Sequence, residues 1–283
     1  MKLQLKNAEL DLSTPAVMGI LNVTPDSFSD GGNWSDLSRA CTHAWTMAEQ
    51  GAKIIDVGGE STRPGAAPVS EDEEKRRVIP VIQRLVYERL PALISIDSMK
   101  PNVMRMAVTA GAVMLNDVNA LRAPGALEVA AESGAAVCLM HMLGQPADMQ
   151  SYPVYADVSR EVAEFLLGRA AVCMAAGIPK ERMVIDPGFG FGKTMEHNLA
   201  LLANLKQLTG IGMPVLVGMS RKSMLGAILE VPAGERLHGH SAAVAIAVMQ
   251  GAKLIRTHDV RETVQAVKIA ESVRRFTASK GVS

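Results

Sequence analysis

The sequence predicts an α/β fold, a single eight-fold β/α barrel of the TIM type with a short N-terminal β-hairpin. Short apolar runs alternate with segments of helical periodicity, and such runs are typical of parallel strands buried on both faces. An internal repeat, GAKIIDVG at 51, GAVMLNDV at 111 and GAKLIRTH at 251, places Asp56, Asn116 and Arg256 in one equivalent position. The length of 283 residues is close to the ~250 of one such barrel, so we expect a single domain, 1–283.

The strands follow from apolar runs that end on polar residues or glycine. An alternating segment predicts the hairpin within 1–14, the barrel extends over 15–275, and a tail is expected at 276–283. An open doubly wound sheet would need a G-x-G-x-x-G fingerprint after the first strand, and the loop after Leu21 has none. The eight core strands are expected at 17–21, 54–57, 93–96, 113–115, 136–140, 183–186, 214–217 and 253–255.

Helical spacing of apolar residues separates these strands. Gly51 ends the first helix, and a charged amphipathic helix begins near Glu71. The stretch 142–156 contains Gly, Pro and Tyr and is expected to be a surface loop. Further helices are expected at 36–50, 101–110, 125–133, 157–176, 223–230, 240–250 and 260–275.

The composition favours a small-molecule ligand. The chain has 29 basic and 29 acidic residues, so we expect neither a nucleic-acid nor a membrane partner. Cys41, Cys138 and Cys173 are odd in number and follow no metal or disulfide spacing, which predicts reduced thiols and a cytoplasmic location. The charged N-terminus resembles neither a signal peptide nor a membrane span.

Polar residues end most of the expected strands, and in a barrel those ends meet at one mouth. The carboxylates and the amide could receive a flat heterocycle with several N–H donors, and the cations could receive a polyanion. Each residue also has a plain structural interpretation, since strand-end carboxylates often cap helices and cations often lie on solvated faces. The candidates are Asn22, Asp97, Asn116, Asp186, Lys222, Arg256 and His258, with Arg63 in the loop 60–65.

The segment MVIDPGFGFGK, residues 183–193, carries the clearest signal. An apolar strand delivers Asp186 to a glycine-rich loop, and a carboxylate at this place is costly unless it receives hydrogen bonds. The glycines would let the backbone approach a ligand closely. The segment therefore predicts a ligand-binding loop.

Five motifs together resemble one family of enzymes. They are GILNVTPDSFSDGG from Gly19, DVGGESTRPGA from Asp56, DPGFGFGK from Asp186, GMSRKS from Gly218 and RTHDV from Arg256, and they occur in this order. Over nearly its whole length the chain resembles the dihydropteroate synthases. The resemblance implies condensation of 6-hydroxymethyl-7,8-dihydropterin pyrophosphate with p-aminobenzoate to 7,8-dihydropteroate and pyrophosphate, in folate biosynthesis. It also implies a pterin-binding barrel, Mg²⁺, a homodimer and competition by sulfonamides.

The resemblance also implies a role for individual residues. Asn22 would hold Mg²⁺, and the loops 22–33 and 60–68 would close over the reaction. The catalytic residues would be Arg63, Lys222, Arg256 and His258. The pterin would contact Asp97, Asn116, Asp186 and Lys222; pyrophosphate would contact Asn22, Arg63, Arg256 and His258; and p-aminobenzoate would contact Phe28, Thr62, Pro64 and Ser223.

Two departures and two rival functions accompany this interpretation. The family usually has Asp-Thr where this chain has Asp97-Ser98, and His238-Gly239-His240 is unusual; we expect the latter to be surface or helix-start residues without a role. A pterin-dependent methyltransferase would also need acidic residues under the pterin, but it would not need the cations. A non-catalytic pterin-binding protein would not need the intact loops.

Overall fold

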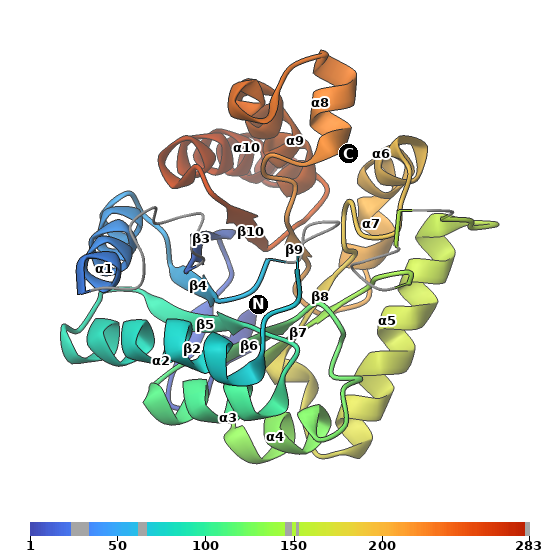
Figure 1. Ribbon diagram of the computed structural model, residues 1–283. Helices are drawn as coiled ribbons and strands as arrows, with labels where there is room; N and C mark the ends of the chain where they lie inside the picture. Colours follow the sequence, from blue (N-terminus) through green and yellow to red (C-terminus); the bar gives the residue numbers. More distant parts are fainter. Residues whose placement is uncertain (24–33, 62–66, 145–148, 151–152, 281–283) are drawn as a thin grey trace.

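The computed structural model describes residues 1–23, 34–61, 67–144, 149–150 and 153–280. Within these residues, parallel strands form one sheet in the order β8-β7-β6-β5-β4-β3-β10-β9, and a bridge between Ile185 and Val215 joins its two ends. Figure 1 shows the strands around a common centre with the helices outside. The predicted barrel is confirmed, and the open doubly wound alternative is wrong. The strands are β3 (Ala16–Asn22), β4 (Ile54–Gly58), β5 (Leu93–Asp97), β6 (Met114–Asp117), β7 (Ala136–Met140), β8 (Met183–Asp186), β9 (Leu216–Val217) and β10 (Leu254–Thr257).

The predicted hairpin packs under the barrel. Its strands, β1 (Lys2–Gln4) and β2 (Glu9–Asp11), pair antiparallel. Leu3 and Leu12 are fully buried in one apolar cluster with residues from the early part of the barrel strands. The hairpin therefore fills the end of the barrel at which the strands begin, and the N-terminus lies within the ring of strands in Figure 1.

The inner face of the barrel changes from apolar to polar along several strands. Because successive side chains of a strand alternate between its two faces, residues two apart point into the same space. In each case an apolar residue of the cluster below is followed by a polar residue nearer the strand end, and this polar layer lies where barrel enzymes build their sites. The pairs are Ile54 and Asp56, Met114 and Asn116, Val184 and Asp186, and Leu254 and Arg256.

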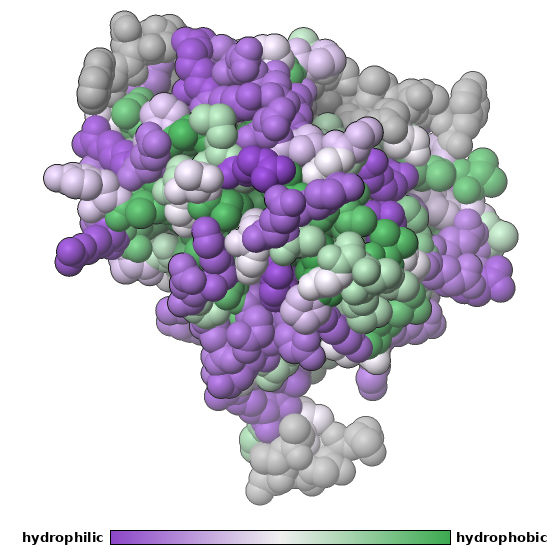
Figure 2. Space-filling view, turned by 90° about the horizontal axis from the view of Figure 1, so that it is seen from below, coloured by the Kyte–Doolittle hydropathy of each residue, from purple (hydrophilic) through white to green (hydrophobic). Residues whose placement is uncertain are grey.

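The helices cover the outside of the barrel. Figure 2, seen from below the view of Figure 1, shows hydrophilic residues over much of this face with hydrophobic residues grouped between them. None of the described helices has both the length and the apolar character that a membrane crossing requires. The helices are α1 (Trp34–Glu49), α2 (Glu71–Tyr87), α3 (Pro101–Ala110), α4 (Ala126–Ser133), α5 (Val158–Ala175), α6 (Met195–Ala203), α7 (Leu205–Thr209), α8 (Ser223–Leu229), α9 (Leu237–Met249) and α10 (Val260–Lys280).

Two expected boundaries are wrong. Helix α10 continues to Lys280, so residues 276–280 are helix rather than tail. No glycine or proline interrupts the helix before Gly281, and the Thr277 hydroxyl donates to the Val273 carbonyl within it at 3.0 Å. Helix α9 begins at Leu237, three residues before the expected start at 240. Its first turn therefore includes the His238-Gly239-His240 segment.

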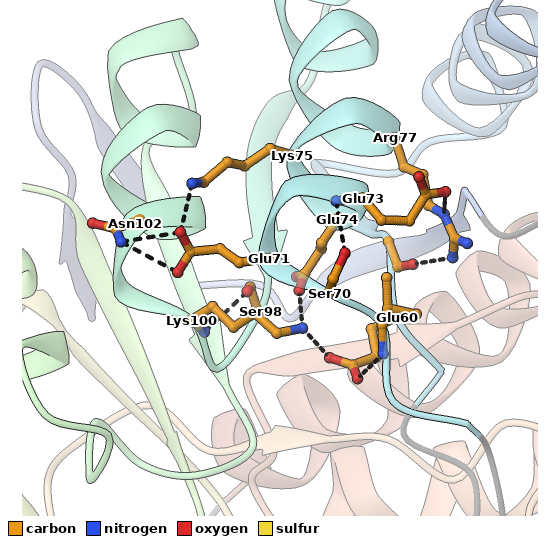
Figure 3. A network of polar contacts seen from close by, with 12 residues as sticks. Glu60, Ser70, Glu71, Glu73, Glu74, Lys75, Arg77, Ser98, Lys100 and Asn102 are labelled. Atoms are coloured by element: carbon orange, nitrogen blue, oxygen red, sulfur yellow. Dashed lines mark hydrogen bonds and ion pairs between the residues drawn. The ribbon is translucent and has the colours of Figure 1, made fainter.

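A buried ion network stands beside the strand ends of β4 and β5 (Figure 3). Lys100, the residue before α3, places its ammonium 2.6 Å from Glu60 Oε2 and 2.5 Å from Glu74 Oε2. Glu60 Oε1 accepts a hydrogen bond of 2.9 Å from the backbone N–H of Val69. Glu60 and Val69 lie on the two sides of residues 62–66. The network therefore fixes both ends of the segment that carries the expected residues Thr62, Arg63 and Pro64.

We expect Lys100→Met to lower the free energy of unfolding by about 3 kcal/mol, because Glu74 would keep a buried charge without its partner. The Glu74 side chain is 0% exposed, whereas that of Lys100 is 23% exposed, which favours the low end of the effect for a buried pair. The measurement is urea unfolding followed by circular dichroism. Lys75→Met is the matched control, because the pair of Lys75 with Glu71 is a partly exposed helix pair worth less than ~0.5 kcal/mol. Equal losses in the two variants would contradict the prediction.

Candidate active site

Arg256 is the centre of a polar network inside the barrel. Its Nε donates to Asp56 Oδ2 at 2.6 Å, and its Nη2 donates to Asp97 Oδ2 at 2.6 Å. Asn116 Nδ2 also donates to Asp56 Oδ2, at 2.9 Å. The three residues that the internal repeat placed in one position therefore meet in space, and Asp97 joins them from β5.

The charges of this network hold one another in place. Burial raises the pKa of Asp97, and the positive charge of Arg256 opposes this rise. The two carboxylates in turn raise the pKa of Arg256 against its own burial, so the guanidinium stays charged. Asp56 is fully buried, and its Oδ1 has no hydrogen-bond partner among the described residues. A guanidinium has five N–H donors, so these bonds leave Arg256 able to donate further.

Asp56 is the functional residue that the strand-end reasoning missed. It lies in the middle of β4, two residues before the strand ends at Gly58, so it did not count as a strand-end residue. The internal repeat was the signal that could have found it, because that repeat gave Asp56 the same position as Asn116 and Arg256.

Asp186 and Lys222 form a second charged group across the mouth. Asp186 Oδ1 accepts a hydrogen bond of 2.7 Å from the Gly188 N–H, so the carboxylate holds the glycine-rich loop rather than capping a helix. Lys222 donates to the Phe189 carbonyl, and its ammonium lies 4.6 Å from the centre of the Phe191 ring. Burial raises the pKa of Asp186. Burial also lowers the pKa of Lys222 to about 8, against the attraction of Asp186.

The glycine-rich loop is built around a buried lysine. The Lys193 ammonium lies 2.9 Å from the Gly188 carbonyl, 3.0 Å from the Phe191 carbonyl and 3.0 Å from His141 Nδ1. Burial lowers the pKa of Lys193 to about 7, and burial together with the Lys193 charge lowers the pKa of His141 to about 3. At Gly188, with φ at +66°, a Cβ would lie 1.9 Å from the His141 carbonyl oxygen. Only glycine fits there.

Sequence reasoning gave neither Lys193 nor His141 a function. His141 follows β7 directly, so its place at a strand end was the available signal. Lys193 closes the DPGFGFGK motif, but nothing in the sequence shows that its side chain turns back into the loop.

The remaining expected residues lie around the same mouth or outside the described residues. Asn22 ends β3 and pairs with Gly58, which in turn pairs with Asp97. The His258 backbone N–H donates to Ser220 Oγ at 3.2 Å, and the same hydroxyl lies 3.0 Å from His258 Nδ1. Ser223 is exposed as the first residue of α8. Phe28, Thr62, Arg63 and Pro64 lie outside the described residues, so their expected roles stay predictions.

The two departures from the family pattern have different outcomes. The Ser98 hydroxyl accepts from the Lys100 N–H at 3.2 Å, and Met99 packs against the buried cluster that includes Met140 and Met142. His238-Gly239-His240 lies in the first turn of α9, as expected of helix-start residues, but His240 is not a surface residue, because it is buried and its Nε2 lies 3.1 Å from Thr257 Oγ1. His240 lies on the same face of α9 as the buried Ala243, Val244 and Ala247, whereas His238 is exposed.

The mouth of the barrel therefore combines three kinds of group. Asp97 and Asp186 offer carboxylate oxygens and Asn116 offers an amide, while Lys222, after β9, and Arg256, on β10, offer charged donors from the part of the closed ring next to β8. Such a set can bind the edge of a planar heterocycle that carries both donors and acceptors.

Comparisons with known proteins agree with this chemistry. The model of the family described as pterin binding enzymes matches residues 18–258. The dihydropteroate synthase of Escherichia coli (strain K12) is 54% identical over 272 residues, which are 96% of this chain and 96% of that protein.

Solved structures agree as well. A Yersinia pestis dihydropteroate synthase in a sulfonamide complex superposes with a TM-score of 0.92 at 52% identity, covering 97% of this chain and 100% of that one. A Xanthomonas albilineans dihydropteroate synthase in complex with 7,8-dihydropteroate gives a TM-score of 0.88 at 45% identity, with coverage of 97% and 99%. The chain belongs to the pterin-binding enzymes and, within them, to the dihydropteroate synthases.

Proposed function

We propose that the mouth of the barrel condenses 6-hydroxymethyl-7,8-dihydropterin pyrophosphate with p-aminobenzoate, giving 7,8-dihydropteroate and pyrophosphate for folate synthesis. The observation that carries the proposal is the group of Asp97, Asn116, Asp186 and Lys222 at one mouth, in a chain whose relatives include structures with a sulfonamide and with 7,8-dihydropteroate. The similar proteins named above are synthases, which favours this reaction over methyl transfer and over binding without catalysis.

The proposed roles follow from charge and hydrogen-bonding capacity. Asp186 and Asp97 accept the N–H groups of the pterin, Asn116 pairs with its polar edge, and Lys222 donates to an acceptor of the ring. The amine nitrogen of p-aminobenzoate forms a bond to the pterin methylene carbon and loses a proton, while the C–O bond breaks and pyrophosphate leaves with the electron pair. Arg63, Arg256 and His258 stabilise the charge that grows on the leaving oxygens. No side chain acts as a nucleophile in this scheme.

We propose that Mg²⁺ takes part and that Asn22 is its ligand from the protein. Among the described residues, no group of three or more acidic, His or Cys side chains is arranged to hold a metal ion. A single amide oxygen suits Mg²⁺, which keeps several waters and takes further oxygens from a phosphate substrate. When bound, the ion supplies positive charge against the pyrophosphate. Asn22 fits this role because Gly58 alone separates it from Asp97 in the sheet.

Turnover tests the proposed function directly. We expect the purified chain to release pyrophosphate from the pterin substrate only when p-aminobenzoate and Mg²⁺ are both present. Good binding of both substrates by the wild-type chain without pyrophosphate release would contradict the proposal.

Asp186→Asn should weaken binding of the pterin and of its pyrophosphate alike, by ~2–5 kcal/mol, because the amide turns a donor toward a donor. Calorimetry with both ligands measures the loss.

The ionisation of Lys222 predicts an alkaline limb in the pH profile. The charged ammonium is present below a pKa of about 8 and is lost as the pH rises through that value. We therefore expect kcat/KM for the pterin substrate to fall above about pH 8. In Lys222→Arg, whose guanidinium stays charged, the rate should be lower but this limb should disappear. An unchanged limb in the arginine variant would assign the ionisation to another group.

We also propose a homodimer formed through α9 and α10. The two helices lie side by side at the top of Figure 1 and expose several large apolar side chains. Apolar residues gathered on one surface are typical of protein interfaces. The exposed apolar residues are Ile246, Met249, Ile269, Val273 and Phe276.

A cytoplasmic location is proposed as well, because all three cysteines are buried free thiols.

We expect Ile269→Glu to convert the dimer to a monomer of 30.1 kDa, because the interface would have to bury a charge. Light scattering after size exclusion measures the mass. Tyr87→Glu is the control, since Tyr87 is exposed at the end of α2, on another side of the barrel. A wild-type chain that is monomeric throughout would refute the proposal.

A further inference from the structure

A buried histidine on α9 contacts the strand end that carries Arg256 and His258. His240 is 1% exposed, and its Nε2 lies 3.1 Å from Thr257 Oγ1 and 3.4 Å from Thr263 Oγ1. Thr257 ends β10 and Thr263 belongs to α10, and both are fully buried. Three elements of the fold therefore meet at these three side chains.

The hydrogen-bond partners of this group determine where its protons lie. Thr257 Oγ1 accepts from the Asp259 N–H at 3.0 Å and contacts Thr263 Oγ1 at 3.0 Å. Thr263 Oγ1 lies 2.7 Å from the Asp259 carbonyl oxygen, which can only accept. Thr263 has one hydroxyl proton for two acceptors, this carbonyl and Thr257 Oγ1. We assign the proton to the carbonyl, which is nearer and can only accept, so the contact between the two hydroxyls takes its proton from Thr257.

This arrangement leaves one role for His240. The Thr257 hydroxyl has given its proton to Thr263, so the contact with His240 Nε2 needs a proton from the imidazole. The other ring nitrogen, Nδ1, is buried without a hydrogen-bond partner among the described residues. A proton on Nδ1 would be a buried unpaired donor, which is costly. The neutral Nε2–H tautomer satisfies every contact of the chain His240, Thr257, Thr263 and Asp259.

The position of Thr257 gives this chain a functional consequence. Thr257 stands between Arg256, which is bound to Asp56 and Asp97, and His258, whose N–H donates to Ser220. Asp259, the next residue, is paired with Arg221 at 2.7 Å. The bonds of Thr257 to His240 and Thr263 tie this strand end to α9 and α10.

We propose that His240, through its Nε2–H bond to Thr257, is a positioning residue that holds Arg256 and His258 for the pyrophosphate group. The inference rests on the proposed function, because it takes Arg256 and His258 as the pyrophosphate contacts. His240 does not touch the substrate in this scheme. It acts chiefly on affinity for the pyrophosphate end, because the bonds of Arg256 to Asp56 and Asp97 keep the pterin contacts in place without it.

The charged groups near His240 agree with a neutral ring. Burial lowers the pKa of His240 to about 4, while the smaller effects of Asp259 and Arg221 raise and lower it. The imidazole therefore stays neutral at the pH values at which the enzyme would be assayed.

The first test is the tautomer of His240 in the wild-type chain. Nitrogen-15 spectra of histidine-labelled protein should show one neutral ring with a protonated Nε2 and a bare Nδ1, unchanged from pH 5.5 to pH 8.5. The signal is assigned to His240 by its absence from the spectrum of the His240→Gln variant. A protonated Nδ1, or titration within this pH range, would overturn the proposal whether or not the chain is a synthase.

The second test compares two ligands in matched variants. Calorimetry measures the affinity for pyrophosphate with Mg²⁺ and, separately, for a pterin without pyrophosphate. His240→Leu should weaken pyrophosphate binding about three- to tenfold, the effect of one lost hydrogen bond, and leave pterin binding within twofold. His240→Gln should restore most of the loss, because its amide can donate to Thr257. His238→Leu, on the exposed side of the same turn, is the control and should change neither affinity.

A double-mutant cycle with Thr257→Val shows whether the effect passes through Thr257. In the Thr257→Val background, His240→Leu should weaken pyrophosphate binding no further. An equal further loss in that background, or equal losses for both ligands, would mean a general structural role and would refute the proposal. Wild-type protein that binds no pyrophosphate would instead refute the proposed function. If His240→Leu does not fold, the tautomer of His240 and the comparison of His240→Gln with the wild-type chain still test the proposal.

Discussion

The site depends on one guanidinium that bridges two carboxylates inside a closed barrel. Arg256 bonds Asp56 and Asp97 at 2.6 Å each, from a strand on the other side of β3 from β4 and β5. A carboxylate buried as fully as Asp56 is tolerated only with a charged partner and further hydrogen bonds, which Arg256 and Asn116 supply. Removing Arg256 would leave both carboxylates buried without a charged partner. The polar layer is therefore a unit, and its geometry is fixed before a ligand binds.

This polar layer is possible because the barrel is filled below it. The hairpin leucines and the inner apolar residues of the strands close the end at which the strands begin. Water is thereby kept from the underside of the charged network, and electrostatic interactions are stronger where water is excluded. The N-terminal hairpin therefore supports the site, although none of its residues belongs to the polar layer. Its role would be missed if the barrel alone were considered.

Much of the fold follows from local patterns, because apolar runs and glycine stops are sequence signals. The eight strands and the hairpin are predicted within a few residues, and the internal repeat gives Asp56, Asn116 and Arg256 one equivalent position. The repeat does not by itself predict the contact of these residues, which follows because equivalent positions of a barrel face the same space. The carry-over of roles to Arg63, Thr62, Pro64 and Phe28 rests on resemblance alone.

Other features depend on side-chain direction, which no local pattern records. His240 is buried against Thr257 and Thr263, which lie on β10 and α10. Lys193 ends a glycine-rich loop, and its ammonium turns back to the carbonyls of that loop. Both side chains satisfy partners that lie in the same loop or on another element. Such partners become visible only when the strands are closed into a ring.

The balance of charge at the mouth argues for a division of labour between the barrel and its loops. Among the described residues, the carboxylates of Asp56, Asp97 and Asp186 face the cations Arg256, Lys222 and Lys193, so the inner layer is close to neutral. A neutral layer with fixed donors and acceptors suits an uncharged heterocycle, because hydrogen bonds decide its orientation. Such a layer is not enough for a pyrophosphate, because its negative charge needs more positive charge than Arg256 alone offers through its remaining N–H groups. In the proposed function, charge from outside this layer, from Arg63, His258 and Mg²⁺, therefore joins Arg256 in binding the leaving group. Loss of that outer charge would then impair the reaction while the pterin still binds, because the inner layer retains every contact it offers to the ring.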